Sequence, residues 1–274
     1  MSKGIAIHWF RQDLRIKDNP SLEAASQHES IIPVYILDDV NSGEFAMGAA
    51  SRWWLHKSLE KLNESLGGNL LIYKGNPSDI FNNIMKEEDI SYISWNRCYE
   101  PWRIDRDKAV KKDLESQNIN VESFSGALLW EPWKISKDDG TPYLIYTPYK
   151  NKWLKQYENK NVEILPELVC NNFVKVSFNF PSLSEIGFSH SQIKVKRYNF
   201  SELDNYELTR NYPSLNSTSF LGPHLRFGTV SIRMIINNLN NKNSSFLNEL
   251  IWREFFIQIL FHFTCHISIY SVFT

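Results

Sequence analysis

The segment IAIHWFRQDLRIKDNPSLEAASQHESIIPVYIL, residues 5–37, sets the fold of the first half of the chain. It holds an apolar run at Ile5–Phe10 and another at residues 31–37, separated by a stretch of helical character. Further short runs rich in β-branched residues follow at residues 70–73, 92–95 and 120–124. A helical pattern at residues 51–66 ends at a Gly-Gly pair. Buried strands alternating with crossover helices predict a doubly wound, Rossmann-like parallel sheet, an α/β domain over residues 1–130.

The pattern changes after this domain. Residues 131–200 are rich in turn-forming and polar stretches such as KDDGTP at 137–142, and we interpret them as a long connection between domains. Helical spacing of apolar residues returns at 230–239 and 246–263. We therefore expect residues 201–274 to form the first part of an all-α domain.

The composition excludes several classes of protein. Of the 274 residues, 42% are hydrophobic and 22% are charged, which is typical of a globular protein and not of a disordered or fibrous one. Thirty Lys and Arg against 31 Asp and Glu give a formal net charge of -1, so a polyanionic partner must meet a local basic patch. Cys98, Cys170 and Cys265 form no CxxC pair, which favours a reducing cytoplasm over a disulfide framework or a zinc ribbon.

Neither a membrane nor a metal is expected. The last apolar run, residues 255–263, contains Gln258 and His262 and is far shorter than the roughly 20 residues of a membrane span. His262, Cys265 and His266 have loosely metal-like spacing but no carboxylate partner or second cluster, so we predict no metal site.

Usual nucleotide motifs are missing, although the sheet class often binds nucleotides. There is no GxGxxG after the first strand and no GxxxxGK[ST] in the chain. The loop FRQDLR, residues 10–15, follows the first strand, where open α/β sheets place ligand-binding loops. On its own it is equally well interpreted as a charged turn that closes the strand and caps the next helix.

Two further sets of residues allow both structural and functional interpretations. Glu249, Trp252 and Arg253 are spaced i, i+3 and i+4, so they project from one face of a helix. Spacing alone favours a surface Glu249–Arg253 ion pair beside a core tryptophan. Thr218 and Ser219 precede a short helical stretch, where hydroxyls and backbone N–H groups either cap the helix or bind a phosphate.

Taken together, these motifs resemble the DNA photolyase/cryptochrome family, and most closely a class I cyclobutane pyrimidine dimer photolyase. The resemblance covers nearly the whole chain in order. Its segments are FRQDLR at 10–15, AASRWWL at 49–55, NRCYEPW at 96–102, YTPYK at 146–150, TSFLGPHLRFG at 218–228 and ELIWREF at 249–255.

The resemblance implies FAD as cofactor. It assigns cofactor binding to Tyr206, Thr218, Ser219, Phe220, Leu221, Gly222 and Glu249. Many relatives have Ser where this chain has Gly222, so one hydroxyl contact is lost there. It also allows an antenna chromophore in the α/β domain, methenyltetrahydrofolate or a deazaflavin, and leaves open that there is no antenna. The stretch around residues 96–102 lacks an Asn-Glu pair associated with one folate-binding branch.

The resemblance also implies the reaction. Excited reduced FAD transfers an electron to a cyclobutane dimer in UV-damaged DNA, and the protein positions both. Catalytic roles fall to Glu249, which hydrogen-bonds the damaged bases, and to Trp252, which stacks on the flipped-out dimer. Arg210, Lys150, Trp252 and Arg253 are the expected DNA contacts.

An alternative is a cryptochrome-type blue-light photoreceptor without repair activity, although Glu at position 249 favours the dimer-repairing branch. A non-catalytic nucleotide-binding α/β protein would not need the helical motifs. Because the family continues with helices that enclose the flavin, we expect a member truncated within its FAD-binding domain. The apolar face of residues 246–263 would then be exposed. We expect a cytoplasmic monomer.

Overall fold

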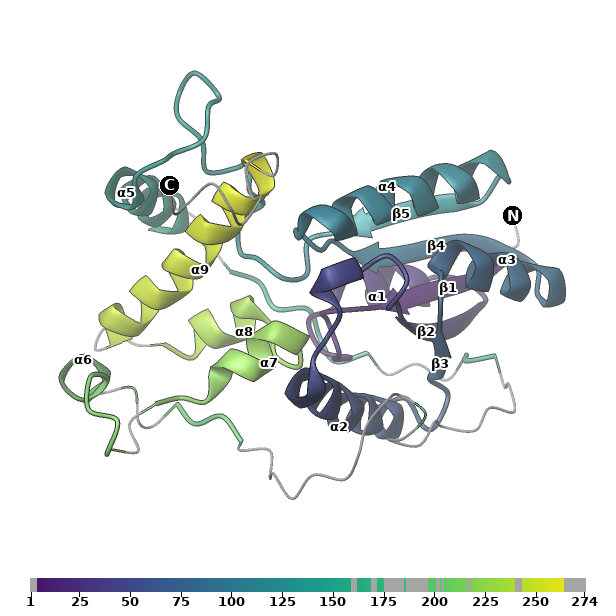
Figure 1. The fold of residues 1–274 in the computed structure, drawn as a ribbon, viewed down its shortest axis with the longest axis horizontal. Coiled ribbons are helices and arrows are strands. Elements are labelled where there is room, and N and C mark those ends of the chain that lie inside the picture. The colour runs from purple at the N-terminus through teal and green to yellow at the C-terminus, as the bar shows by residue number, and fades with distance from the viewer. Residues whose placement is uncertain are drawn as a thin grey trace.

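The computed structural model describes residues 4–158, 162–168, 172–174, 185, 197–200, 203, 205–215, 218–239 and 243–263. An α/β domain lies beside a group of helices from the second half of the chain (Figure 1). The sheet has five parallel strands in the order β3-β2-β1-β4-β5. They are β1 (Ile5–Phe10), β2 (Ser30–Leu37), β3 (Leu71–Lys74), β4 (Ile90–Asn96) and β5 (Asn120–Phe124). The predicted doubly wound parallel sheet is confirmed.

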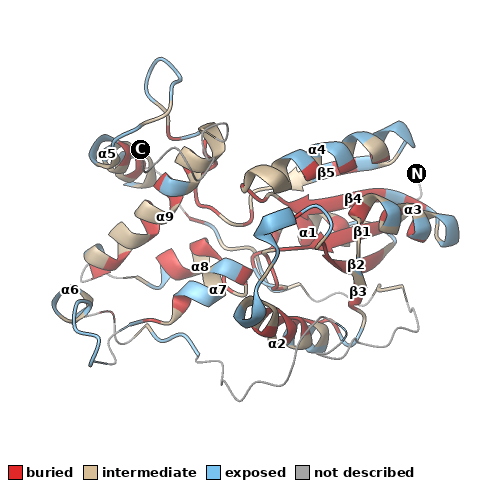
Figure 2. Cartoon of the chain, in the orientation of Figure 1, coloured by how far each residue is buried: buried red, intermediate tan, exposed pale blue. Residues whose placement is uncertain are grey.

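Helices cover both faces of this sheet, and its three central strands, β2, β1 and β4, are almost entirely buried, whereas the edge strands β3 and β5 are partly exposed (Figure 2). The covering helices are α1 (Pro20–Ser26), α2 (Ala49–Ser65), α3 (Pro77–Glu87) and α4 (Pro101–Ser116). Trp9 packs in one cluster with Phe81 of α3, whereas its neighbour Phe10 packs in another with Leu59 of α2. Successive strand residues point to opposite faces, so both must be apolar when both faces are covered.

The second half of the chain forms a separate helical core. Its helices are α5 (Tyr146–Glu158), α6 (Tyr206–Thr209), α7 (Leu221–Phe227), α8 (Ile232–Asn237) and α9 (Ser244–His262). A short 3-10 helix, η1 (Gly43–Phe45), precedes α2. Helix α5 lies within residues 131–200, the stretch interpreted from its turn-forming and polar pattern as a long connection between domains. Of its side chains only Tyr149 and Trp153 are buried, so no wide apolar stripe indicates a helix in the sequence.

The apolar side chains of α9 are exposed only in part, and not along the whole face as expected. Phe246, Leu250, Ile251 and Phe255 are buried in one cluster with side chains of α5 and α8, including Trp153. The other apolar side chains of the helix are partly exposed, among them Leu247, Ile257, Ile259, Leu260 and Phe261, and Phe256 is the most exposed aromatic, at 61%. The described helices therefore already enclose a core of their own.

The FRQDLR loop joins the two halves. The backbone N–H of Leu14 donates to Phe227 O at 3.1 Å, and the Arg15 guanidinium donates to Gly126 O at 2.7 Å and Gly228 O at 2.9 Å. Gly228 has φ +66°, and a Cβ at that position would lie 1.9 Å from Gln12 O. The charged loop after β1 therefore acts as an interdomain clamp, and a glycine is required where the two backbones meet.

Candidate functional site

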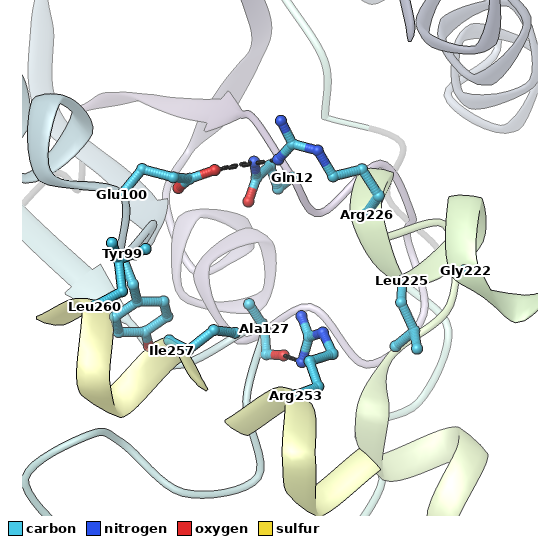
Figure 3. Close-up of a pocket in the computed structure, with 10 residues that line it drawn as sticks. All are labelled: Gln12, Tyr99, Glu100, Ala127, Gly222, Leu225, Arg226, Arg253, Ile257 and Leu260. Atoms are coloured by element: carbon cyan, nitrogen blue, oxygen red, sulfur yellow. Dashed lines mark hydrogen bonds and ion pairs between the residues drawn. The ribbon is translucent and has the colours of Figure 1, made fainter. Parts of the chain in front are cut away.

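A cleft lies where the two halves meet, beyond the carboxyl ends of β1 and β4. The strand order reverses at this point, which is where open α/β sheets bind ligands. The cleft encloses a cavity of about 320 Å³ between the sheet loops, α7 and α9 (Figure 3). Its lining consists of Gln12, Tyr99, Glu100, Ala127, Gly222, Leu225, Arg226, Arg253, Ile257 and Leu260. Two of the predicted site residues, Gly222 and Arg253, are therefore brought together.

One carboxylate organises the polar side of this cleft. Glu100 Oε1 accepts a hydrogen bond from Gln12 Nε2 at 2.7 Å and another from Arg226 Nη1 at 3.1 Å (Figure 3). Arg103 Nε lies 3.5 Å from the same oxygen. Burial alone would raise the pKa of Glu100, but Arg103 and Arg226 hold it below its usual value. The carboxylate is ionised, and the arginines around it leave an excess of positive charge suited to an anionic ligand.

Arg253 lies inside the cleft, although the sequence analysis expects it to contact DNA. Its Nη1 donates to Ala127 O at 3.0 Å, and burial lowers the pKa of its guanidinium. The surface ion pair with Glu249 that spacing alone favours is not formed, because Glu249 accepts from Arg210 instead. This placement associates Arg253 with the cleft and not with the outer face of α9.

Three of the predicted residues, Tyr206, Arg210 and Glu249, lie together at the outer face of α9, the side of the helix that carries Glu249 and Trp252. Arg210 Nη1 donates to Glu249 Oε1, and the two side chains are 35% and 36% exposed. The Arg210 guanidinium also lies over the ring of Tyr206, 5.2 Å from its centroid. Cation, carboxylate and aromatic ring thus form one partly exposed cluster, whose ion pair is open to competition from water and ligands.

Trp252 lies one turn further along the same helix, in a stack of aromatic rings. Its ring is parallel to that of Tyr146, with centroids 3.5 Å apart and 8° between the planes. The Phe256 ring lies 5.4 Å away at 23°. Tyr146 Oη donates to Asn248 O at 3.1 Å. Burial, with a smaller contribution from Glu249, raises the pKa of Tyr146 to about 12, so its hydroxyl stays protonated at neutral pH.

The predicted phosphate-binding segment lies at the start of α7. The backbone N–H of Leu221 donates to Ser219 Oγ at 3.3 Å, so this hydroxyl already has a local partner. Phe220 is the N-cap residue and has φ +55°. Ser219 is buried and Thr218 is exposed, while Gly222 leaves open space toward the cleft. Tyr206, expected to share this segment's ligand, instead packs on α9 with its ring edge-on to Phe246.

The remaining predicted groups are placed as follows. Lys150 lies half-buried on α5. Among the described residues, no group of three or more His, Cys, Asp and Glu side chains could hold a metal ion. His262 Nε2 lies 3.4 Å from Pro132 O, while Cys265 and His266 are outside the described residues. Across the part of the chain described, no helix has the length and apolar character needed to span a membrane.

Sequence patterns assign no role to several residues of the site. Glu100, Arg226 and Tyr146 all lie within the quoted motifs, but their side-chain partners are distant in sequence. Glu100 had one usable signal, because it follows the predicted strand at residues 92–95. Residues that follow neighbouring parallel strands converge at the sheet edge. No comparable local signal connects Tyr146 to Trp252.

Comparisons with known proteins give the family. The model of the DNA photolyase family matches residues 6–169. A deoxyribodipyrimidine photo-lyase of Agrobacterium fabrum is 33% identical, with 94% of this chain and 59% of that relative covered. Cryptochrome-1 of Arabidopsis thaliana is 30% identical, with 90% of this chain and 40% of that relative covered.

A solved structure supports the same conclusion. The crystal structure of a class III photolyase from Agrobacterium tumefaciens superposes with a TM-score of 0.79 at 30% identity, covering 96% of this chain and 60% of that one. The chain therefore spans 40% to 60% of the length of these three relatives. The family match covers more than half of the chain and agrees with the fold, so this chain belongs to the DNA photolyase family.

Proposed function

We propose that this chain binds FAD in the interdomain cleft and UV-damaged DNA at the outer face of α9. Its reaction is then the light-dependent splitting of cyclobutane pyrimidine dimers. The observation that carries the proposal is the arrangement of α9 itself. Residues advance about 100° along a helix, so Glu249, Trp252 and Arg253 belong to one continuous side. Arg253 reaches the cleft, whereas Glu249 and Trp252 remain accessible beside it.

The cleft fits part of a flavin nucleotide. A cavity of about 320 Å³ is at the lower end of the range for ligand pockets, roughly 300–1,000 Å³. It accommodates a ring system but not a whole dinucleotide, so the described residues would form one wall of a larger site. Arg226 and Arg253 supply positive charge for an anionic group, and Gly222 permits close approach to the start of α7.

Thr218, Ser219, Phe220, Leu221 and Tyr206 remain proposed cofactor contacts, with Glu249 at the boundary between the cofactor and DNA sites. When bound and excited in its reduced form, FAD supplies the electron that weakens the bonds joining the two bases. The chain's own contribution is to hold the cofactor and to exclude water from the cleft.

The outer face of α9 provides the groups that an extruded dimer requires. Trp252 offers an indole surface on which a base can stack, and the Glu249 carboxylate can accept hydrogen bonds from base edges. Arg210 is positioned beside them to bind a backbone phosphate, with Lys150 as a weaker contact. Because Arg210 pairs with Glu249 in the free protein, DNA binding would exchange this carboxylate for a phosphate. Arg253 lies in the cleft and donates to Ala127 O, so it is proposed as a residue of the cofactor site and not as a DNA contact.

A cryptochrome-type photoreceptor without repair activity is the second candidate, and the 30% identity to the Arabidopsis cryptochrome favours it. An antenna chromophore, methenyltetrahydrofolate or a deazaflavin, remains a proposal for the α/β domain. We further propose that the protein acts as a cytoplasmic monomer, consistent with the free, buried thiol of Cys98.

The test uses purified chain incubated with FAD and then desalted, with the bound flavin reduced by dithionite under anaerobic conditions before illumination. We expect retained flavin absorbance, tighter binding of UV-irradiated than of unirradiated oligonucleotide, and restoration of the bases under illumination. Trp252→Ala and Glu249→Gln should each lower the preference for irradiated DNA. Glu64→Gln is the matched control, because Glu64 also forms an exposed ion pair, with Lys61 on α2. Binding of irradiated DNA without restored bases would favour the photoreceptor, and absence of both flavin and damage preference would refute the proposal.

A further inference from the structure

The ring of Tyr146 covers one face of the indole that is proposed to receive the damaged base. Centroids 3.5 Å apart and nearly parallel planes leave no room for another ring between them. The Phe256 ring is also stacked against the indole, with centroids 5.4 Å apart and 23° between the planes, but Phe256 is 61% exposed and can move aside more easily than Tyr146. A base can therefore stack only on the side of Trp252 away from Tyr146.

Tyr146 is also fixed to the backbone of α9. Its hydroxyl donates to Asn248 O at 3.1 Å, and this carbonyl is the i−4 hydrogen-bond acceptor for the Trp252 N–H in a regular helix. The Tyr146 ring contacts Phe255 edge-on, with centroids 5.7 Å apart. One side chain thus contacts three positions of α9 around the turn that carries Glu249 and Trp252.

The helix that carries Tyr146 is held firmly against α9. Trp153 Nε1 on α5 donates to Glu254 Oε2 at 2.7 Å, and the Glu254 side chain is buried. Glu254 Oε1 accepts a second hydrogen bond from the backbone N–H of Leu129. A buried carboxylate with such partners is costly to displace. Tyr146 is therefore anchored by its own hydroxyl and by the packing of its helix.

We propose that Tyr146 is a positioning residue that holds Trp252 as a one-sided stacking surface, at a fixed location relative to the Glu249 carboxylate. This inference rests on the proposed function and extends it to a residue outside α9. The ligand is one planar base of an extruded pyrimidine dimer, which stacks on the open side of the indole while its polar edge reaches Glu249.

The experiment compares Tyr146→Leu, Tyr146→Phe and Tyr157→Leu with the parent chain. Tyr157 also lies on α5 and packs on Trp153, with ring centroids 5.3 Å apart, so its replacement controls for a general loss of aromatic packing. Each variant is titrated with UV-irradiated and unirradiated oligonucleotides, and its melting temperature is recorded. Acrylamide quenching attributable to Trp252 is obtained by subtracting the signal of the matching variant that also carries Trp252→Phe.

We expect Tyr146→Leu to weaken the binding of irradiated DNA about tenfold, the scale of one lost base stack, with little change for unirradiated DNA. Tyr146→Phe keeps the ring but loses the bond to Asn248, so its loss should be roughly two- to threefold. Trp252 should become more accessible to acrylamide in Tyr146→Leu only. Tyr157→Leu should change the melting temperature without changing the preference or the quenching.

Two results would overturn the inference. One is a Tyr146→Leu variant with the parent's damage preference and Trp252 quenching, and the other is an equal loss of preference in Tyr157→Leu. Failure of the proposed function gives a different pattern, because the parent chain itself would then show no preference for irradiated DNA. In that case the quenching data still decide whether Tyr146 fixes Trp252.

Discussion

The clamp loop after β1 and the outer face of α9 both contain arginines, carboxylates and large aromatic rings, but they use them differently. Arg15 is 6% exposed and donates to the backbone carbonyls of Asp18, Gly126 and Gly228. Arg210 has a side chain that is 35% exposed and one carboxylate partner. The first guanidinium holds main chain from both domains together, whereas the second can exchange its partner.

The difference follows from the environment of the charge. A buried cation must have every donor satisfied by fixed acceptors, because water cannot replace a partner that is lost. A partly exposed ion pair contributes little to stability, because water and salt compete with it continuously. A motif rich in charged residues therefore indicates a ligand site only where those residues remain exposed. Substitutions can test this distinction directly.

Arg15→Met is the change expected to have the largest effect. It removes the donors for Gly126 and Gly228 and leaves buried acceptors unpaired, which should lower the free energy of unfolding by about 3–5 kcal/mol. Arg210→Met, the same substitution on the outer face of α9, should cost no more than about 1 kcal/mol. Urea unfolding followed by circular dichroism measures both. Equal losses in the free energy of unfolding would show that the buried Arg15 and the exposed Arg210 do not differ in their contribution to stability.

The pH dependence of stability sharpens the contrast for the buried region. Burial lowers the pKa of His8 to about 4, with Arg11 and Arg15 acting in the same direction and Asp13 opposing them. Between pH 6.5 and about 4 the unfolded chain gains a proton at this residue that the folded chain does not. The contribution of His8 to the free energy of unfolding is therefore fully present above pH 6.5. It falls by up to about 3 kcal/mol as the pH is lowered through this window.

Urea unfolding of the parent chain and of His8→Asn between pH 4 and pH 7 measures this contribution. The variant should lose much of the acid-dependent decline within the window given by the lowered pKa of His8. The Asn side chain can still hydrogen-bond Ser21, which lies 3.0 Å from His8 Nδ1. Identical pH profiles for the two proteins would show that His8 is not the group responsible.

Local sequence patterns predicted the elements whose burial is visible along the chain itself. The apolar run at Ile5–Phe10 coincides with β1, because a strand covered on both faces must be continuously apolar. The i, i+3 and i+4 spacing of Glu249, Trp252 and Arg253 correctly placed them on neighbouring positions of one helix, but it did not show that Arg253 faces the cleft. Helix α5 escaped prediction because its buried stripe consists of only Tyr149 and Trp153.

The partners of the charged groups could not be predicted in the same way. Arg15 and Gly228 are 213 positions apart, and Arg210 and Glu249 are 39 apart. Neither spacing corresponds to a helical or strand period, so no local rule connects them. The family resemblance located the motif around Arg15 but did not distinguish a ligand-binding loop from an interdomain clamp. That distinction depends on how the two halves of the chain dock.

Gly228→Ala tests the clamp through its backbone instead of its charges. The residue has φ +66°, and the new Cβ would overlap Gln12 O. Left-handed strain and the steric overlap together should lower the free energy of unfolding by about 2–3 kcal/mol. Gly140→Ala is the matched control, because Gly140 has φ +79° but no atom near the position of a Cβ. Calorimetry or urea unfolding should show a smaller loss in the free energy of unfolding for Gly140→Ala. Equal losses in the two variants would show that the contact between Gly228 and Gln12 does not account for the effect.

Arg210→Ala has the smallest expected effect on stability, and its main consequence should appear in DNA binding. The variant loses one exposed ion pair, so the free energy of unfolding should fall by less than about 1 kcal/mol. If Arg210 exchanges Glu249 for a phosphate, the slope of log K against log salt for irradiated DNA should decrease by about 1. Lys61→Ala removes another exposed ion pair, on α2 and distant from Arg210 in the sequence, and should leave that slope unchanged. An unchanged slope in Arg210→Ala would assign Arg210 to the stability of α9 alone, and the outer face of the helix would then resemble the clamp more closely than its exposure suggests.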